Sequence, residues 1–337
     1  MTTLKGVAGH AGVSVATAAR VLQRDPNLSV RPETRARVLA SAAALGYRPN
    51  RLASGLRTRR TGAIAVVLPD PQNLAWSEVL RGIEQAAAER EYVVVVADAH
   101  GPTLDPQQLS RFVLEGRMDG LLVAFATVVD ELVAQIAGRG LPLLPINSRS
   151  NNVDGSVTMD DETGSRLAVD HLVALGHRKI GFLAGRADTD VGRRREAGYR
   201  AAMATHGLAV DPAWVASGDY TERTAREVAL GLLALPTPVR PTALFAVNLP
   251  SALGIRAAAR DCGMRIPDDL SLVTMDDHAI LEHTDPALTS IHLPMDEMGV
   301  LGARMLLDVI EGQPLRHEVT STPPRLVVRR STAAPPG

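Results

Sequence analysis

From residue 61 onward, short apolar runs alternate with longer stretches of helical periodicity, and this alternation restricts the possible folds. The apolar runs predict strands at 63–68, 93–97, 120–125, 143–146, 179–184, 242–247 and 272–275. Helical patterns fill the gaps, for example at 77–90, 164–175, 195–206 and 251–262. Such alternation is typical of parallel sheets with right-handed crossovers. The series runs twice, breaking near 157–161, and therefore predicts an α/β body of two doubly wound parallel-sheet subdomains.

The first 61 residues differ from the rest of the chain in charge. They contain eleven Lys and Arg residues and two acidic residues, whereas the remainder contains 25 basic and 35 acidic residues. A small basic module joined to an acidic body indicates that the module meets a polyanion. A solvated basic face is the alternative, and a charge of +9 on 61 residues makes it the weaker interpretation.

The basic module is predicted to be all-α, with three short helices. Apolar residues repeat at helical spacing from Leu4 to Ala11, and Gly12 ends that helix. Ser14 is a good N-cap for the second helix, and a third is expected at 32–44. Two short helices joined by a tight turn form a helix-turn-helix, whose second helix enters the DNA major groove. A three-helix packing domain is the alternative.

The sequence lacks the residues that several classes of protein require. Cys262 is the only cysteine, which excludes a disulfide framework, and the nine histidines show no metal-ligand pairing. No apolar run has the length of a membrane span, and the N-terminus is too polar for a signal peptide. Phosphate-binding and dinucleotide-binding glycine motifs are missing, as is a nucleophile–base constellation. We therefore expect a cytoplasmic protein that is not an enzyme and has no cofactor or metal.

Polar and aromatic residues follow several of the predicted strands. Ligands of parallel sheets bind beyond the carboxyl ends of the strands, and between two subdomains that place is the cleft. Each residue alone has another explanation, because strand-end Asp and Asn often cap helices and Trp76 could belong to the core. Arg193 and Arg194 are expected to be solvated. Together the others resemble a site for a polar small molecule, and they are Asp70, Asn73, Trp76, Asn147, Arg195, Tyr220, Asn248 and Asp276.

Three stretches carry a resemblance that covers nearly the whole sequence: TLKGVAGHAGVSVATAARVLQRDP, NRLASGLRTRRTGAIAVVLPD and, near the end, RLVVRRST. On these stretches the sequence resembles the LacI/GalR family of bacterial transcription regulators. The resemblance implies a helix-turn-helix domain at 1–49, a hinge helix and linker at 50–61, and an effector-binding, dimerising body at 62–337. That body is periplasmic-binding-protein-like, with subdomains of about 62–159 plus 292–322 and about 160–291 plus 323–332.

The resemblance also implies which residues contact DNA. Residues matching Val15, Ala16 and Arg20 face base edges, and Arg20 should carry most of the direct readout because a guanidinium can bond both acceptors of guanine. In the hinge, Leu56 matches the leucine that both subunits insert into the minor groove. Gly55 makes that short helix marginal, and we hypothesise that it orders only with operator and partner. The predicted set is Ser14, Val15, Ala16, Thr17, Arg20, Tyr47, Asn50, Ala53, Leu56 and Arg57.

Further motifs match the effector site of the family. NLAWSEVLRGIE, RREAGY, AVNLPSALG and VTMDD place Trp76, Arg195, Asn248 and Asp276 in it, and TMDDETG adds Asp160. Asn147 replaces a frequent Asp, which slightly favours a neutral or anionic ligand over a cationic one.

The implied function is a ligand-responsive repressor that binds a near-palindromic double-stranded operator as a homodimer and takes a small polar effector such as a sugar. A dimer is expected because the sequence ends without a leucine heptad tail. The solute-binding protein of a sugar transporter shares this body, but it requires export and the sequence shows no signal peptide. A cytosolic α/β enzyme is the third possibility, disfavoured by the missing catalytic motifs.

Overall fold

The computed structural model describes residues 3–23, 25, 28–47, 60–70, 73–98, 115–124 and 141–336. The chain divides into two units, Met1–Thr61 and Gly62–Gly337. The predicted hinge residues Asn50, Ala53, Leu56 and Arg57 lie outside the described residues.

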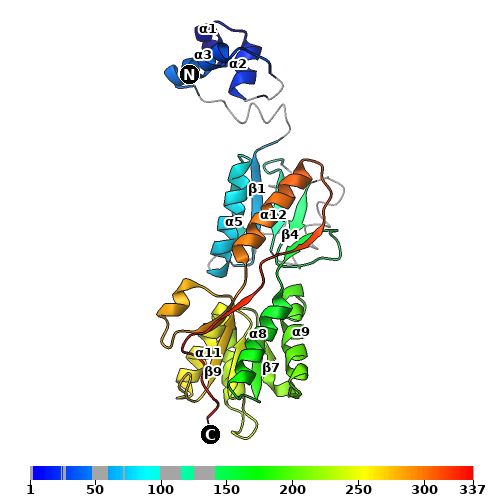
Figure 1. The fold of residues 1–337 in the computed structure, drawn as a ribbon, viewed down its shortest axis with the longest axis vertical. Helices are drawn as coiled ribbons and strands as arrows, with labels where there is room; N and C mark the ends of the chain where they lie inside the picture. Colours follow the sequence, from blue (N-terminus) through cyan, green and yellow to red (C-terminus); the bar gives the residue numbers. More distant parts are fainter. Residues whose placement is uncertain are drawn as a thin grey trace. The chain divides into compact units, whose positions relative to one another are not determined.

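The first unit contains the three predicted helices, α1 (Leu4–Ala11), α2 (Val15–Leu22) and α3 (Pro32–Ala44) (Figure 1). Gly12 ends α1 in the left-handed conformation, with φ 64°. Ser14 caps α2, because its hydroxyl accepts a hydrogen bond of 3.0 Å from the amide of Thr17. The apolar faces of the three helices form one small core, made of Val7, Ala8, Ala11, Ala18, Val21, Val38 and Ala42.

Among its described residues the body contains two larger sheets, each of which defines a subdomain, and one two-stranded sheet. The first sheet has the order β2-β1-β3-β4, with all its pairs parallel. Its strands are β1 (Ala63–Leu68), β2 (Val93–Asp98), β3 (Gly120–Val123) and β4 (Leu143–Pro145). Helices α5 (Ala75–Glu89) and α12 (Met295–Ile310) pack against each other beside β1 (Figure 1).

The second sheet has the order β12-β10-β9-β8-β6-β7. Its strands are β6 (Ile180–Ala184), β7 (Val215–Ser217), β8 (Ala243–Ala246), β9 (Ser271–Met275), β10 (Thr289–His292) and β12 (Arg325–Val327). All neighbours are parallel except β10 and β12, which are antiparallel. The parallel sheets predicted from the sequence are therefore confirmed with the exception of this edge strand.

Helices cover both faces of the second sheet because successive residues of a strand point to opposite faces. Phe182 packs in one core cluster with α8 (Asp161–Ala174) and α9 (Asp190–Thr205). Leu183, the next residue, packs in another with α10 (Glu222–Leu233) and α11 (Leu249–Asp261). Two short 3₁₀ helices, η1 (Pro212–Trp214) and η2 (Ala279–His283), complete the subdomain. The second subdomain is thus doubly wound, as predicted.

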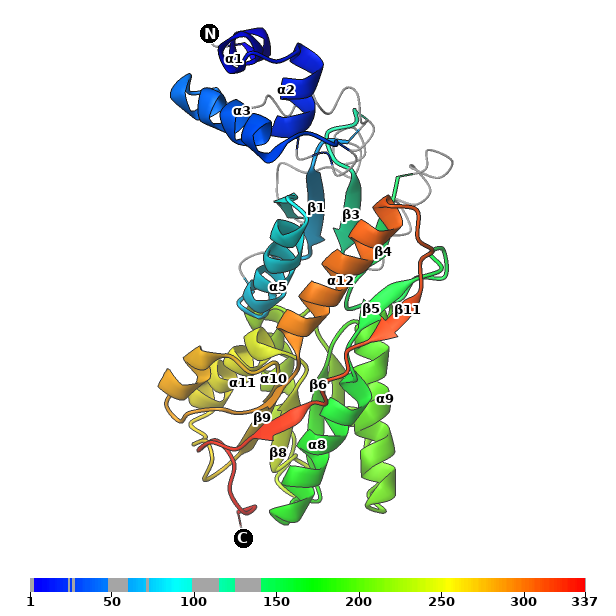
Figure 2. The ribbon, with the colours of Figure 1, turned by 45° about the horizontal axis from the view of Figure 1, so that its top comes forward.

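Three segments of the chain cross between the subdomains. They run from β4 to α8, from β10 to α12, and from β11 (His317–Val319) to β12 (Figure 2). The first segment, 146–161, includes β5 (Ser156–Thr158), which pairs in parallel with β11. The strands β5, β7, β10, β11 and β12 were not predicted. Each has only three or four residues and includes polar ones, so it lacks the continuous apolar run that indicated the equally short β3, β4 and β8.

No helix in the described parts of the chain is long and apolar enough to cross a bilayer.

Candidate functional site

A cavity of about 400 Å³ lies between the two subdomains, where strands of both sheets end. Residues following β1, β3 and β4 line it from the first subdomain, and residues following β6, β7, β8 and β9 line it from the second. The carboxyl ends of parallel strands carry helix N-termini and loops, so polar groups from separate segments converge there. The lining residues are Pro69, Asp70, Asn73, Ala75, Trp76, Asp98, Ala124, Asn147, Ser148, Arg186, Thr189, Val191, Arg195, Asp219, Tyr220, Thr221, Asn248, Asp276 and Met295.

The cavity brings together eight of the nine residues singled out in the sequence for the effector site. The exception is Asp160, which does not line it. The carboxylate of Asp160 instead caps α8, where it accepts a hydrogen bond of 3.0 Å from the amide of Thr163. The carboxylate that contacts the cavity arginine is that of the neighbouring Asp161.

Arg195 is the central charged group of the cavity wall and is 3% exposed. Its Nε lies 2.7 Å from Asp161 Oδ1, and its Nη2 lies 3.1 Å from Asp276 Oδ1. Its Nη1 donates a third bond to the carbonyl of Val247. Burial acts to lower the pKa of Arg195, but the two carboxylates outweigh it and raise that pKa above the ordinary value. The guanidinium is therefore permanently charged and its orientation is fixed by three elements.

Asp276 and Asn248 line the cavity and also make hydrogen bonds within the fold. Burial raises the pKa of Asp276 above its ordinary value, Arg195 opposes that shift, and the nearby Asp161 adds to it. The side-chain oxygen of Asn248 accepts a bond of 2.9 Å from Ser251 and caps α11. Its side-chain nitrogen donates a bond of 3.0 Å to the carbonyl of Tyr220. Asn248 therefore caps α11 and also lines the cavity.

Non-glycine residues with positive φ are concentrated at the cavity. Among the described residues, four non-glycine residues have positive φ, and three of them line it: Asn147 (56°), Tyr220 (72°) and Asp276 (68°). Asn and Asp tolerate this conformation, but a bulky side chain rarely adopts it, at a cost of order 1–3 kcal/mol. The hydroxyl of Tyr220 lies 2.6 Å from that of Thr189. The strained backbone at Tyr220 supports a functional role for the cavity.

The charges of the lining residues limit the ligand. Four carboxylates line the cavity, and they belong to Asp70, Asp98, Asp219 and Asp276. The two lining guanidiniums are already paired, Arg195 as above and Arg186 with Asp188 through contacts of 2.9 and 2.5 Å. Among the described lining residues, an anion would meet excess negative charge and two guanidiniums that are already paired with carboxylates. The structure therefore disfavours the anionic ligand that the presence of Asn147 left open.

Two polar atoms at the cavity wall are buried without a hydrogen-bond partner among the described residues, Asn147 Oδ1 and Ser148 Oγ. An unsatisfied buried polar atom costs about 1–3 kcal/mol. Trp76, which is 7% exposed, adds an apolar ring to the same wall.

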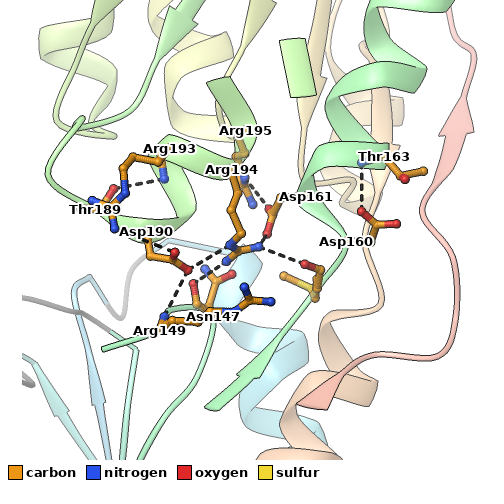
Figure 3. Close-up of polar contacts among 12 residues, drawn as sticks. Asn147, Arg149, Asp160, Asp161, Thr163, Thr189, Asp190, Arg193, Arg194 and Arg195 are labelled. Carbon is orange, nitrogen blue, oxygen red and sulfur yellow. Dashed lines mark hydrogen bonds and ion pairs between the residues drawn. The ribbon is translucent and has the colours of Figure 1, made fainter. Parts of the chain in front are cut away.

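Two adjacent arginines that were both expected to be solvated have different environments in the structure. Arg193 has a side chain that is 58% exposed, as expected of a solvated residue. Arg194 was expected to be solvated too, but its side chain is 11% exposed and contacts Asp161 and Asp190 (Figure 3). The expectation was wrong because a helix turns by about 100° per residue, which points adjacent side chains in different directions.

The predicted recognition helix α2 has an exposed face. Val15 is 44% exposed and Ala16 is exposed, whereas Ala18 and Val21 are buried. The side chain of Arg20 is 42% exposed and its Nε lies 2.7 Å from Asp25 Oδ2. Tyr47, by contrast, is half-buried against the module core.

A helix-turn-helix module joined to a two-subdomain body with a polar cavity defines a ligand-responsive DNA-binding regulator. Residues 3–50 match the family described as "Bacterial regulatory proteins, lacI family", and residues 169–332 match the "Periplasmic binding protein-like domain". Catabolite control protein A of Priestia megaterium is 31% identical over 98% of this chain and 99% of its own. The chain belongs to the LacI family.

Solved structures agree with this assignment. The lac repressor dimer bound to operator and the anti-inducer ONPF has a TM-score of 0.81 with 28% identity, covering 99% of both chains. The transcriptional regulator CelR in complex with cellobiose has a TM-score of 0.74 with 29% identity, covering 98% of this chain and 100% of that one.

Proposed function

We propose that this protein represses transcription by binding a near-palindromic operator as a homodimer, and that a neutral polyhydroxylated molecule in the cavity changes its operator affinity. The observation that carries the ligand class is the cavity wall, in which both arginines are engaged by carboxylates. Such a wall offers many acceptors for hydroxyl groups and no free cation for a phosphate or carboxylate.

Each part of the cavity suits a sugar. The carboxylates of Asp70, Asp98 and Asp219 can accept bonds from hydroxyls, and charge-assisted bonds of this kind are about twice as strong as neutral ones. The ring of Trp76 can cover an apolar sugar face. The complex of the similar protein CelR with cellobiose supports a carbohydrate ligand.

The DNA-binding residues are proposed from the sequence match and the exposure of α2. Ser14, Val15, Ala16, Thr17 and Arg20 would meet the major groove, with Tyr47 at the edge of the module. We propose that 1–49 forms this module, that 50–61 forms the hinge with Leu56 as its minor-groove residue, and that 62–337 binds effector and partner. A protein that acts on DNA in this way would work in the cytoplasm and would catalyse no reaction.

A thermal-shift screen tests the ligand class. Full-length protein is heated with cellobiose, ribose and glucose, and in parallel with glucose 6-phosphate and a nucleoside monophosphate. A ligand at 100 times its Kd adds about 2.7 kcal/mol of stability to the native state, so a neutral sugar that binds should raise Tm by several degrees. The phosphate esters should leave Tm unchanged. Stabilisation by a phosphate ester alone would show that the proposed ligand class is wrong.

A further inference from the structure

A polar cluster links the cavity to the first crossing segment, 146–161. Its centre is Arg194 on α9, in the second subdomain. The guanidinium bonds Asp190 at 2.9 Å, the carbonyl of Met159 at 3.0 Å and the carbonyl of Asn147 at 3.2 Å, and it also bonds Asp161 (Figure 3). One side chain therefore fastens both ends of the crossing segment to α9.

Asp190 adds a second attachment to the same segment. Its Oδ2 bonds Arg194 and also accepts a hydrogen bond of 3.2 Å from the amide of Arg149 (Figure 3). Asn147 and Arg149 directly follow β4 of the first sheet. Arg194 and Asp190 thus connect α9 of the second subdomain with the end of a strand of the first.

Asp161 joins this cluster to the cavity. Its side chain is fully buried, with Oδ1 bonding Arg195 at 2.7 Å and Oδ2 bonding Arg194. Arg195 lines the cavity and Arg194 does not. One carboxylate is thus shared by two guanidiniums. A movement of Arg195 would therefore change the hydrogen bond between Asp161 and Arg194.

We infer that Arg194 and Asp161 are positioning residues that couple the state of the cavity to the placement of the crossing segment. A ligand that shifts Arg195 or Asp276 would act through Asp161 on Arg194, and through Arg194 on the segment that connects the two subdomains. The geometry of an arginine suits this role because its planar fork directs several donors at once, whereas a lysine presents a single point charge. The inference rests on the proposed effector role of the cavity, but its test uses no effector.

The first test compares Arg194→Lys with the matched control Arg193→Lys, both in the full-length chain. Arg193 carries the same charge as Arg194 and lies on the same helix. Its side chain is exposed, however, and its distance to Asp190 is 3.9 Å. Amide hydrogen exchange of peptides covering 146–161 should become about tenfold faster in Arg194→Lys, since charge-assisted buried bonds are lost. Exchange in β8 should stay unchanged, and Arg193→Lys should behave as wild type. Unchanged exchange of 146–161 in Arg194→Lys would overturn the inference.

The second test is a double-mutant cycle that a purely local structural role would not satisfy. Asp276→Asn perturbs the cavity side of Arg195 without a ligand. It should change the hydrogen-exchange rate of 146–161 by about threefold or more in wild type and by much less in the Arg194→Lys background. The same fold-change of that rate in both backgrounds would show that Arg194 does not carry the coupling. If Asp276→Asn lowers the folded fraction, Arg195→Lys replaces it, because Arg195 contacts Asp161 at the cavity side. The same non-additivity is then expected, and additivity again overturns the inference.

Because both tests use the apoprotein, their outcome is independent of the ligand class. A sugar screen without hits would count against the proposed effector and would leave these results standing.

Discussion

Arg195 shows how one residue can combine a binding role with a structural one. Its guanidinium is the shared partner of two buried carboxylates, Asp161 and Asp276. Removing one member of a buried ion pair leaves charge without compensation, which is more damaging than the loss of the pair as a whole.

We therefore expect Arg195→Ala to destabilise the body as well as to abolish any response to effector. The loss should be about 3–5 kcal/mol, as for other broken buried ion pairs. Urea unfolding of the full-length protein measures it. Arg193→Ala, at an exposed site on the same helix, should stay within about 0.5 kcal/mol of wild type. Equal unfolding midpoints for the two variants would contradict the ion-pair account.

The parallel-sheet rule predicted the positions of residues that follow strands, whereas Trp76 and Arg195 lie on helices and were indicated by their motifs. Asn248 and Asp276 follow strands, so the parallel-sheet rule placed them at the cleft. Asp160 and Asp161 are adjacent, and no periodicity tells which one caps α8 and which one turns inward. The pairing of Arg20 with Asp25 was not predicted either, because it depends on the turn after α2.

At the scale of elements, the close packing of α5 and α12 depends on glycine. A Cβ at Gly82 would lie 2.1 Å from the carbonyl oxygen of Asp296, and one at Gly299 would lie 2.2 Å from that of Val79. These are backbone atoms, so the helices themselves would have to separate. Long strands and helices were predictable from their periodicity, but these contacts between residues 214 and 220 positions apart were not.

Gly82→Ala should accordingly lower stability, although alanine favours helices. Overpacking of this kind costs about 1–3 kcal/mol or more, which exceeds the helix-propensity gain of about 1 kcal/mol. Gly231→Ala on α10 is the control, because a Cβ there has no neighbour within 4 Å and should stabilise slightly. The two free energies of unfolding should change in opposite directions. A stabilised Gly82→Ala protein would show that the two helices do not approach as closely as described.

For the whole body, the C-terminal residues return to the second sheet and are held by a buried histidine. His177 is fully buried, with Nδ1 2.8 Å from the hydroxyl of Thr242 and Nε2 2.9 Å from the carbonyl of Ala333. Since a carbonyl only accepts, Nε2 carries the proton and Nδ1 accepts from Thr242. Burial lowers the pKa of His177 below its ordinary 6.5, as it also does for His171.

This arrangement predicts a loss of stability in mild acid. Below pH 6.5 His177 binds a proton in the unfolded chain but not in the folded protein. The stability contributed by neutral His177 is therefore fully present above that pH and decreases as the pH falls toward the lowered folded pKa. The slope should approach about 1.4 kcal/mol per pH unit for one histidine. Unfolding midpoints measured from about pH 7 to about pH 5 should fall for wild type and fall less for His177→Gln. Parallel pH profiles for the two proteins would exclude His177 as the cause.

At the scale of the molecule, one chain is proposed to bind DNA through its basic module and to change that affinity when the body binds a neutral polyol. The most direct measurement is a fluorescence anisotropy titration of the full-length protein on the DNA upstream of its own coding sequence. It is run at several salt concentrations, with and without the sugar that gives the largest thermal shift. We predict binding that weakens steeply with salt and changes by about 5-fold to 150-fold when that sugar is added. Absence of DNA binding at low salt, or an operator affinity that no stabilising sugar alters, would contradict the account.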